Sequence, residues 1–522
     1  MTFHSSVVIL DYGSQYTQLI TRRVRELGIY ARILPGDASL IRIQESLPSA
    51  ILLSGGPSSV YDRDAPQLPE GFLAYQAANH IPVLGICYGM QLLVNTFHGK
   101  VKKAGSREYG RMQVQPFKSS LLFPENQPFQ AWMSHGDEAA ELPAGFQSTA
   151  RSAAGSIAAI ENGAARLYGL QFHPEVTHTE TGTDILKRFL FDIADLKPDW
   201  NMESVLEEQV QLIRDQVGPS DHVICALSGG VDSAVAAALV HRAVGDRLHC
   251  FFVDHGLLRL QEGDRVMELF KNKLHLPVTR LDHSVRYLKK LEGVSDPEQK
   301  RKIIGAEFIQ SFEEAAQLIF SQVGHLARFL VQGTLYPDVI ESSPGHKHSV
   351  MIKSHHNVGG LPENMRFRLV EPLRELFKDE VRLLGRRLGV PPEFLERHPF
   401  PGPGLAVRVI GEVTRERLDI LRKVDEIFIQ SIRNAGLYDQ IWQAFAVFLP
   451  IKSVGVQGDG RTHDYVVALR AVTSADGMTA DWYPFESPFL AKVSSRICNE
   501  VQGVSRVVYD ISSKPPATIE WE

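Results

Sequence analysis

The sequence lacks the features that mark membrane and secreted proteins. No segment approaches the ~20 uninterrupted apolar residues that cross a bilayer. The amino terminus, MTFHSSVVILDYG, has no basic stretch ahead of its short apolar run, so it predicts a first β-strand rather than a signal peptide. These absences favour a cytoplasmic protein.

Cysteine and net charge are also scarce. The 522 residues include four cysteines, and no two have CxxC spacing, so neither a disulfide framework nor a thiolate zinc site is indicated. His346, His348, His355 and His356 lie close together, but no cysteine or carboxylate pattern completes a zinc site around them. The net charge of −6 gives no general attraction for nucleic acids. Chemistry on small molecules is therefore favoured.

The order of apolar segments predicts an α/β protein of about three domains. Strand-like and helix-like runs alternate over residues 1–197 and change from about Lys100 to short strands and turns. A second α/β block occupies residues 198–397, and the stretch HPFPGPG then breaks regular structure. A long helix-like run and two strand-like runs follow within residues 398–522. We predict two α/β domains with mainly parallel sheets and a small α+β domain.

Cys87 lies in the stretch LGICYGMQ, between Gly85 and Gly89. A strand-like run precedes it and a helix-like run follows, which is the strand–turn–helix pattern of a nucleophile elbow. We expect the thiol to project into solvent at the helix amino terminus, where the partial positive charge favours the thiolate. An isolated cysteine is more often a packed small hydrophobe, but the glycine spacing favours a nucleophile.

A base for this thiol is present in the stretch GLQFHPEVTHT. His173 precedes Glu175 by two positions, and Pro174 is expected to keep the chain between them extended. Positions i and i+2 of an extended segment point to the same side, so Glu175 could orient the imidazole of His173. The three side chains would form a Cys–His–Glu arrangement, although a His-Pro-Glu tripeptide alone is more often a simple turn.

Together, GICYGMQ and HPEVTHT resemble the motifs of the class I glutamine amidotransferases. The resemblance implies that Cys87 attacks the carboxamide of glutamine, that His173 protonates the departing ammonia, and that water then cleaves the γ-glutamyl thioester. It further implies an oxyanion hole at the backbone N–H groups of Gly56 and Tyr88, a glutamine contact at Gln91, and a loop flanking the pocket at Ser134 and His135.

A second candidate site is the loop LSGGVDS, residues 227–233, between an apolar strand-like run and an alanine-rich helix-like run. Such a loop points backbone N–H groups and a helix dipole at an anion, and phosphate is the obvious ligand. It is not a Walker A loop, because the G-x-x-x-x-G-K-[ST] pattern is missing. A glycine-rich turn alone could also be merely structural.

The hexapeptide SGGVDS resembles the pyrophosphate loop of the N-type ATP pyrophosphatases, which cleave ATP between its α- and β-phosphates. The resemblance implies ATP as co-substrate and Mg²⁺ near the loop, with Asp232 as a possible ligand. Family members often carry a hydroxyl residue where this chain has Ala234. The ATP-binding residues implied are Ser228, Gly229, Gly230, Val231, Asp232, Ser233, Asp254 and Lys378, the last able to neutralise charge on the transferred phosphorus.

Nearly the whole chain resembles the family of glutamine-hydrolysing GMP synthases, through GTLYPDVIES, HHNVGGLP, HPFPGPGLAVR, VQGDGRTHDY and KPPATIEWE. The resemblance implies that ATP adenylates xanthosine monophosphate (XMP) and that ammonia from glutamine then displaces AMP to give GMP, without a redox cofactor. By composition KPPATIEWE would be predicted to fray. The resemblance instead implies that Arg301, Lys514 and Glu520 bind XMP, and that residues 398–522 form a homodimer contact.

Three other functions remain open at this stage. One is a different pyrophosphate-loop amidotransferase, such as a nicotinate-adenine-dinucleotide amidating enzyme. Another is a tRNA-modifying ligase, which would be expected to have a basic surface or paired cysteines, and the sequence indicates neither. The third is a catalytically silent regulatory homologue, against which the intact Cys87, His173 and Glu175 argue.

Overall fold

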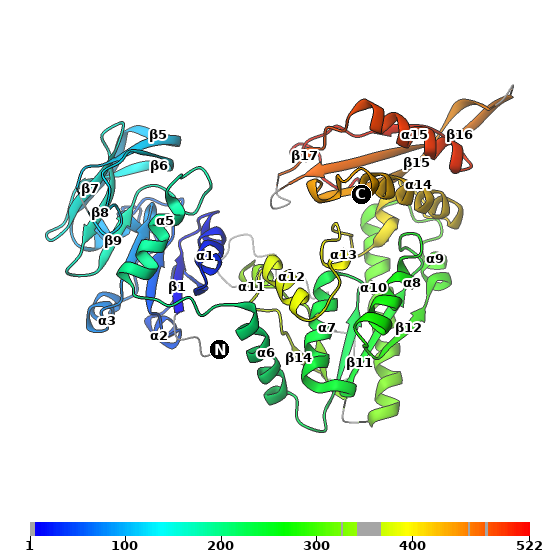
Figure 1. Cartoon of the computed structure of the whole chain (residues 1–522), viewed down its shortest axis with the longest axis horizontal. Coiled ribbons are helices and arrows are strands. Elements are labelled where there is room, and N and C mark those ends of the chain that lie inside the picture. Colours follow the sequence, from blue (N-terminus) through cyan, green and yellow to red (C-terminus); the bar gives the residue numbers. More distant parts are fainter. Residues whose placement is uncertain (1–5, 119, 325–326, 342–366, 458–459, 475–478) are drawn as a thin grey trace. The chain divides into compact units, whose positions relative to one another are not determined.

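The computed structural model describes the chain apart from residues 1–5, 119, 325–326, 342–366, 458–459 and 475–478. The chain divides into two compact units (Figure 1). The first comprises the described residues within 1–208 and 337–350, and the second comprises those within 209–336 and 351–522. Within the described ranges, no helix combines the length and the apolarity needed to cross a membrane.

The first unit is built on a nine-stranded sheet of order β2-β1-β3-β4-β9-β8-β7-β5-β6. Its first five strands are parallel: β1 (Ser6–Asp11), β2 (Tyr30–Pro35), β3 (Ala50–Leu53), β4 (Val83–Ile86) and β9 (Leu167–Leu170). Its other strands are antiparallel to their neighbours: β8 (Ile157–Asn162), β7 (Gln147–Ser152), β5 (Lys100–Pro116) and β6 (Phe129–Glu141). The helices are α1 (Thr17–Glu26), α2 (Leu40–Glu45), α3 (Phe72–Ala78), α4 (Tyr88–Thr96) and α5 (Gly182–Lys187).

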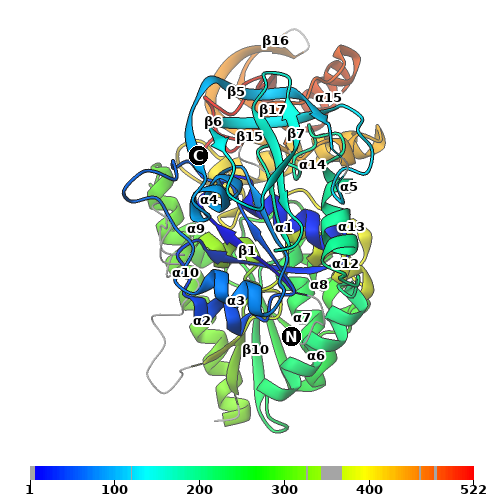
Figure 2. The same ribbon diagram turned by 90° about the vertical axis from the view of Figure 1, so that its left-hand side faces the viewer.

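Both faces of the parallel strands are buried, which explains their continuous apolar sequences. In β1, Val7 and Ile9 join one apolar cluster, whereas Val8 and Leu10 join another. Because successive strand residues point to opposite faces, the two clusters lie on opposite sides of the sheet. The antiparallel strands β5, β6 and β7 gather at one end of the unit (Figures 1 and 2).

The prediction of short strands after Lys100 was wrong for two of them. Strand β5 has 17 residues and β6 has 13, and they pair antiparallel with a register shift between Lys103 and Glu108. The segment after α5 also packs on this unit: the ring of Trp200 lies 5.0 Å from that of Tyr30. The segment KPDW, residues 197–200, which spans the predicted boundary at 197/198, is therefore attached to the first unit at its Trp200 end.

The second unit contains a five-stranded parallel sheet of order β12-β11-β10-β13-β14. Its strands are β10 (His222–Leu227), β11 (Leu248–Asp254), β12 (Val278–Asp282), β13 (Ala327–Val331) and β14 (Arg368–Val370). Helix α6 (Met202–Gln216) crosses from the first unit into the second. The other helices around this sheet are α7 (Val231–Val244), α8 (Glu262–Glu268), α9 (Ser284–Lys290), α10 (Pro297–Val323), α12 (Lys378–Arg387) and α13 (Pro392–Leu395). The chain leaves β10 towards β11 on one side and returns to β13 on the other. Ligands of open α/β sheets bind at such a reversal, outside the carboxyl ends of the strands.

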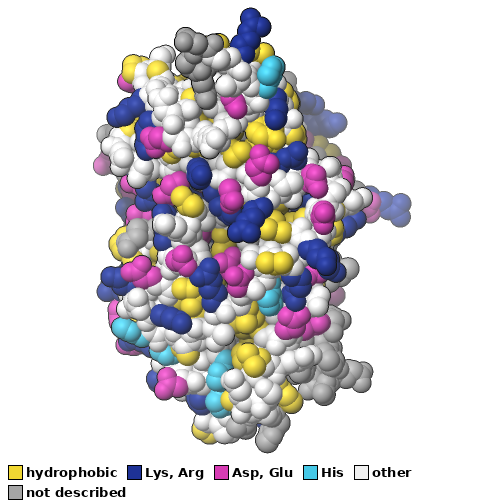
Figure 3. All heavy atoms as spheres, turned by 90° about the vertical axis from the view of Figure 1, so that its right-hand side faces the viewer, with side chains coloured by type: hydrophobic (Ala, Val, Ile, Leu, Met, Phe, Trp, Pro, Cys, Tyr) yellow, Lys and Arg dark blue, Asp and Glu magenta, His cyan; other side chains and the backbone are white. Residues whose placement is uncertain are grey.

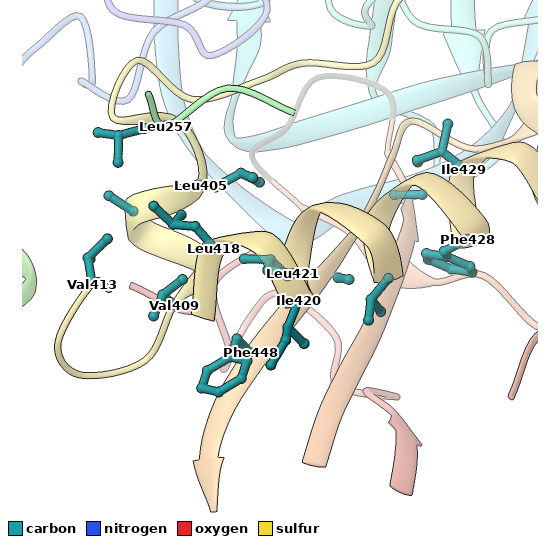
Figure 4. Close-up of a cluster of buried hydrophobic side chains, with 14 of the residues drawn as sticks. Leu257, Leu405, Val409, Val413, Leu418, Ile420, Leu421, Phe428, Ile429 and Phe448 are labelled. Atoms are coloured by element: carbon teal, nitrogen blue, oxygen red, sulfur yellow. The ribbon is translucent and has the colours of Figure 1, made fainter. Parts of the chain in front are cut away.

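The remaining elements form the predicted α+β part: η6 (Gly404–Arg408), α14 (Arg415–Asn434), β15 (Gln443–Gln457), β16 (Gly460–Thr473), β17 (Asp481–Trp482), α15 (Ser487–Glu500) and β18 (Val504–Tyr509). Helix α14 packs on β15 through its apolar face. The cluster beneath it joins Leu421 and Phe448 of this part to Leu257, which follows β11 of the parallel sheet, with Leu405 among them (Figure 4). The two parts of the second unit therefore share one core.

The surface shows no segregation of charge on the face in Figure 3, where the described Lys and Arg side chains are interspersed with Asp and Glu. This mixing agrees with the small net charge of −6. It gives a nucleic-acid ligand no extended basic track on that face.

Candidate active site

Cys87 stands at the sharp turn between β4 and α4. Its φ is +52°, in the left-handed region that a non-glycine residue rarely adopts. Both glycines are required for packing: a Cβ on Gly85 would lie 2.5 Å from the backbone of Gly89, and a Cβ on Gly89 would lie 2.4 Å from Leu53 O. The structure thus has the elbow geometry. The expectation that the thiol projects into solvent was wrong, since Cys87 is only 5% exposed.

The structure brings Cys87, His173 and Glu175 together. Nδ1 of the imidazole lies 2.7 Å from Oε1 of Glu175, and the Cys87 thiol is close enough to the ring to raise the pKa of His173. His173 and Glu175 are 3% and 1% exposed. Pro174 and Glu175 lie in a turn, so the expectation of an extended segment was wrong although the two side chains do meet.

Two opposing effects set the charge of His173. Burial is the larger single influence and lowers its pKa, but the Glu175 carboxylate and the hydrogen bonds with Cys87 and Glu175 together raise the pKa well above 6.5. A protonated imidazole beside a buried sulfur favours an ion pair of thiolate and imidazolium. The arrangement can therefore supply both a nucleophile and the proton for a leaving group.

The predicted oxyanion donors lie at the ends of two elements beside this pair. Gly56 lies in the loop that follows β3. This loop is next to His173, because a Cβ on Gly55 would lie 3.2 Å from Cε1 of His173. Tyr88 is the first residue of α4, where backbone N–H groups have no partner within the helix. Its side chain turns elsewhere, with the hydroxyl donating to Pro66 O at 2.6 Å. Only the backbone of Tyr88 is thus placed for the role.

The residues predicted to flank the glutamine pocket lie on β6 rather than on a loop, which corrects that expectation. The carbonyl oxygen of Ser134 lies 3.6 Å from Cys87 Sγ, so the strand forms a wall beside the nucleophile. His135 is buried, and its two ring nitrogens lie 3.0 Å from Glu108 Oε2 and from Asp137 O. Both nitrogens are therefore occupied by structural partners.

Gln91 and two residues that the sequence did not single out complete the surroundings. Gln91 Nε2 donates to Asp137 O at 2.9 Å and to Gln171 Oε1 at 3.2 Å. Gln171 Nε2 lies 3.7 Å from Cys87 Sγ. Tyr16 packs edge-on against the imidazole of His173, with 5.0 Å between ring centroids.

The loop at residues 228–233 joins β10 to α7 at the carboxyl edge of the second unit's sheet. Gly229 has φ +76°, and Gly230 is the residue before the helix, with Val231 as its first residue. The hydroxyls of Ser228 and Ser233 lie 3.1 Å apart across the loop, and Ser228 Oγ accepts from Gly230 N–H. This is the geometry of an anion-binding loop at a helix amino terminus.

Asp232 suits a cation-binding role. Lys378 Nζ lies 3.0 Å from its Oδ2, which places the predicted basic residue at the loop. Its other oxygen, Oδ1, is buried and has no hydrogen-bond partner within the described part of the chain. A carboxylate oxygen in that state fits a hard cation such as Mg²⁺. No group of three or more metal-binding side chains is found among the described residues, and His346, His348, His355 and His356 lie outside them.

Asp254 ends β11, the strand next to β10, but its carboxylate is engaged. Arg280 forms an ion pair with Oδ2, and the backbone N–H of Gly256 donates to Oδ1 at 3.0 Å. The side chain therefore fixes the local loop. A nearby residue not expected from the sequence is Arg397, which forms an ion pair with Glu262 and reaches the carbonyl of Gly229 at 3.4 Å.

The residues predicted to bind XMP lie at the tail formed by residues 511–522. Glu520 accepts two hydrogen bonds from the fully buried Arg408, at 2.9 and 3.1 Å, and another from Gln443. Arg301 donates to the backbone oxygen of Glu522. The backbone N–H of Lys514 donates to Ala480 O at 2.7 Å.

Two further buried cations hold the tail. Lys300 is fully buried and forms an ion pair with Glu522 while donating to Val409 O at 2.7 Å. Arg470, also fully buried, donates to the carbonyl oxygens of Ser512, Thr518 and Ile519. The described tail is anchored, contrary to what its composition suggests.

Comparisons with known proteins assign family models to two parts of the chain. Residues 8–193 match the family "Glutamine amidotransferase class-I", and residues 430–521 match the "GMP synthase C terminal domain". The GMP synthase (glutamine-hydrolyzing) from Rhodopseudomonas palustris strain BisB18 is 55% identical over 99% of this chain and 96% of its own length. The one from Chlorobium chlorochromatii is also 55% identical, over 99% of this chain and 100% of its own length. A solved structure of a putative GMP synthase subunit from Thermoplasma acidophilum is 29% identical, covering 37% of this chain and 96% of its own, with a TM-score of 0.33.

A buried cysteine–histidine–glutamate site in a class I amidotransferase domain, followed in the same chain by a GMP synthase C-terminal domain, defines a glutamine-dependent amidotransferase. More narrowly, the chain belongs to the family of glutamine-hydrolysing GMP synthases, because relatives with that name match nearly its whole length. The predicted fold class and the predicted family are both confirmed.

Proposed function

We propose that this protein is an ATP-dependent ligase that converts XMP to GMP with ammonia taken from glutamine. The observation that carries the proposal is that one chain combines the Cys87–His173–Glu175 arrangement with an anion-binding loop at residues 228–233. Free ammonia is mostly protonated at neutral pH and is then not nucleophilic. Coupling a glutaminase to a site that activates the acceptor avoids this loss.

The glutaminase reaction follows from the first site. Cys87 sulfur attacks the carboxamide carbon of glutamine, and the backbone N–H groups of Gly56 and Tyr88 stabilise the oxyanion. Protonated His173, held by Glu175, gives its proton to the departing ammonia. Neutral His173 then takes a proton from water, which cleaves the γ-glutamyl thioester to glutamate and restores the thiol.

The synthetase reaction belongs to the second unit. The 2-oxygen of XMP attacks the α-phosphorus of ATP, forming adenyl-XMP and releasing pyrophosphate, and ammonia then displaces AMP. The loop around Ser228 and Ser233 would hold the pyrophosphate, with Lys378 countering charge that develops on phosphorus. Asp232 is the side chain that we propose holds Mg²⁺, which supplies charge neutralisation of the phosphates when bound.

We place XMP at the tail, with Arg301, Lys514 and Glu520 as contacts. A pocket of about 560 Å³ is lined by Val508–Ser512, Ala517–Thr518 and Glu520–Trp521. Since the Glu520 carboxylate is bound by Arg408, we assign it the role of fixing the pocket wall. We also propose domain boundaries at 1–197, 198–397 and 398–522, a homodimer formed through the last of these, and a cytoplasmic location.

The experiment that tests this function identifies products by mass spectrometry after the full-length protein is incubated with ATP, Mg²⁺, glutamine and XMP. We expect GMP, AMP, pyrophosphate and glutamate in equal amounts. Parallel reactions replace XMP with nicotinate adenine dinucleotide or with tRNA. Amination of either instead of XMP would establish one of the rival functions, and no turnover with any acceptor would favour a silent homologue.

Two variants separate the sites. Cys87→Ala should abolish glutamine-driven synthesis while leaving synthesis with added ammonium salts, because the second unit needs only ammonia. Asp232→Ala should stop ATP cleavage with either nitrogen source. If Cys87→Ala loses both activities with its fold preserved, the division into two sites is wrong.

A further inference from the structure

Gln171 is a fully buried polar residue at the nucleophile with no role in the reaction derived above. It directly follows β9, and its backbone N–H donates to Ala158 O at 2.9 Å. The preceding residue, Leu170, accepts the backbone N–H of Cys87 at 2.7 Å. The backbones of Gln171 and Cys87 are thus tied to the same strand, so the distance between their side chains is set by the sheet.

The direction of the Gln171 amide follows from a chain of hydrogen bonds. Asp137 O is a carbonyl oxygen and accepts only, so the Gln91 atom 2.9 Å from it must be the nitrogen. That NH₂ group also donates to Gln171 across 3.2 Å, which makes the receiving Gln171 atom its oxygen. The remaining end of the Gln171 amide, 3.7 Å from Cys87 Sγ, is therefore an N–H donor.

A donor in this position favours the anionic form of the sulfur. Cys87 is only 5% exposed, so water does little to solvate a thiolate there. His173 reaches the sulfur from its own side, and Gln171 provides a second, uncharged donor. A hydrogen bond to the charged form of a buried group stabilises that form. An amide cannot transfer a proton under these conditions, so it does not compete with His173.

We propose that Gln171 is a further residue of the glutaminase reaction, donating its amide N–H to the Cys87 sulfur to hold it in place and stabilise the thiolate, and that Gln91 acts through Gln171 by fixing that amide. This inference rests on the proposed glutaminase function. It adds a positioning role to Gln91 beyond the expected contact with glutamine.

The test measures how fast iodoacetamide alkylates Cys87 as a function of pH in the full-length protein, with the modified peptide followed by mass spectrometry. In Gln171→Met the midpoint of the alkylation profile should rise by about one pH unit, as expected for the loss of one hydrogen bond to a charged group. In Gln171→Glu, which keeps the shape but turns an acceptor towards the sulfur, it should rise further. Glutamine-driven turnover should fall about tenfold in Gln171→Met, with ammonium-driven turnover unchanged.

Gln76→Met is the matched control. Gln76 is also buried in the first unit, and its amide donates to Ile81 O at 2.7 Å, away from the thiol. This variant should keep the wild-type alkylation profile. The inference is overturned if the Gln171→Met alkylation profile coincides with that of the wild type, or if the Gln76→Met profile shifts equally. If Gln171→Met does not fold, an unshifted Gln171→Glu profile overturns the inference instead. Failure of the proposed function would appear separately, as a wild-type protein that makes no GMP from glutamine.

Discussion

Replacing Glu175 with glutamine should strongly reduce glutamine-driven synthesis while leaving ammonium-driven synthesis intact. Glu175 Oε1 accepts from His173 Nδ1 at 2.7 Å, and its charge is a main reason why the pKa of His173 is raised despite burial. Glutamine has the same shape but no charge. The variant therefore removes the charge that stabilises the imidazolium and leaves the packing nearly unchanged.

The size of the effect follows from the burial of this hydrogen bond. His173 and Glu175 are 3% and 1% exposed, so solvent screens their interaction little. A hydrogen bond to a charged group contributes about 1.5–3 kcal/mol, which corresponds to roughly a 10- to 150-fold change in rate. We expect a loss near the upper end, about 10²-fold, because burial strengthens the electrostatic part.

The same variant should change the pH dependence in a defined direction. With its pKa raised above 6.5, wild-type His173 stays protonated as the pH rises past that value. Without the carboxylate, burial is opposed less and lowers this pKa, so the imidazolium is lost at a lower pH. Glutamine-driven activity of Glu175→Gln should decline with rising pH earlier than that of the wild type.

The assay compares GMP formation from glutamine and from ammonium chloride over a range of pH. Glu141→Gln is the matched control, because Glu141 is exposed in an ion pair with Lys100 and should alter neither rate. A Glu175→Gln protein with wild-type glutamine-driven turnover would refute the role given to this carboxylate. So would equal loss with both nitrogen sources in a folded protein.

Three further substitutions have distinct expected outcomes. Gly89→Ala places a Cβ 2.4 Å from a carbonyl oxygen of the neighbouring strand, so thermal unfolding should show about 1–3 kcal/mol of destabilisation, whereas Gly105→Ala, with nothing within 4 Å, should show little. Lys300→Met removes the cation paired with the buried Glu522 carboxylate, which should loosen the tail by about 3–5 kcal/mol. Steady-state kinetics should then show a KM for XMP that is more than about tenfold higher. Lys378→Met should lower ATP cleavage about 10²-fold with both nitrogen sources, while the melting temperature changes by no more than about 2 °C because the ion pair of Lys378 is half-exposed.

The fold could be predicted where the chain buries both faces of its strands. Runs such as VVIL and VICAL are apolar throughout because helices cover both sides of each sheet, and this pattern is visible in the sequence. Strands β5 and β6 were predicted too short, since β5 contains Gly105, Gly110 and several charged residues that are typical of turns. Its pairing with β6 overrides these local preferences, and no local pattern records that pairing.

The candidate site was predictable only to the extent that its residues are close in sequence. The turn around Cys87 and the His173–Glu175 pair both depend on neighbours within a few positions. The burial of Cys87 depends instead on distant segments such as β6, where the carbonyl oxygen of Ser134 lies 3.6 Å from the sulfur. Gln171 was missed because its hydrogen bonds with Gln91 and Cys87 join residues 80 and 84 positions apart.

The tail shows why long-range partners matter for assigning function. Lys300, Arg408 and Arg470 are fully buried, and each binds the segment from Ser512 to Glu522. Burying a cation costs free energy that its partners offset only in part, and apolar side chains would hold a tail equally well. The three buried cations that bind this one short segment therefore indicate that the position of the segment is important for function. A pocket wall that must match a nucleotide needs that fixed position, and a merely attached tail does not.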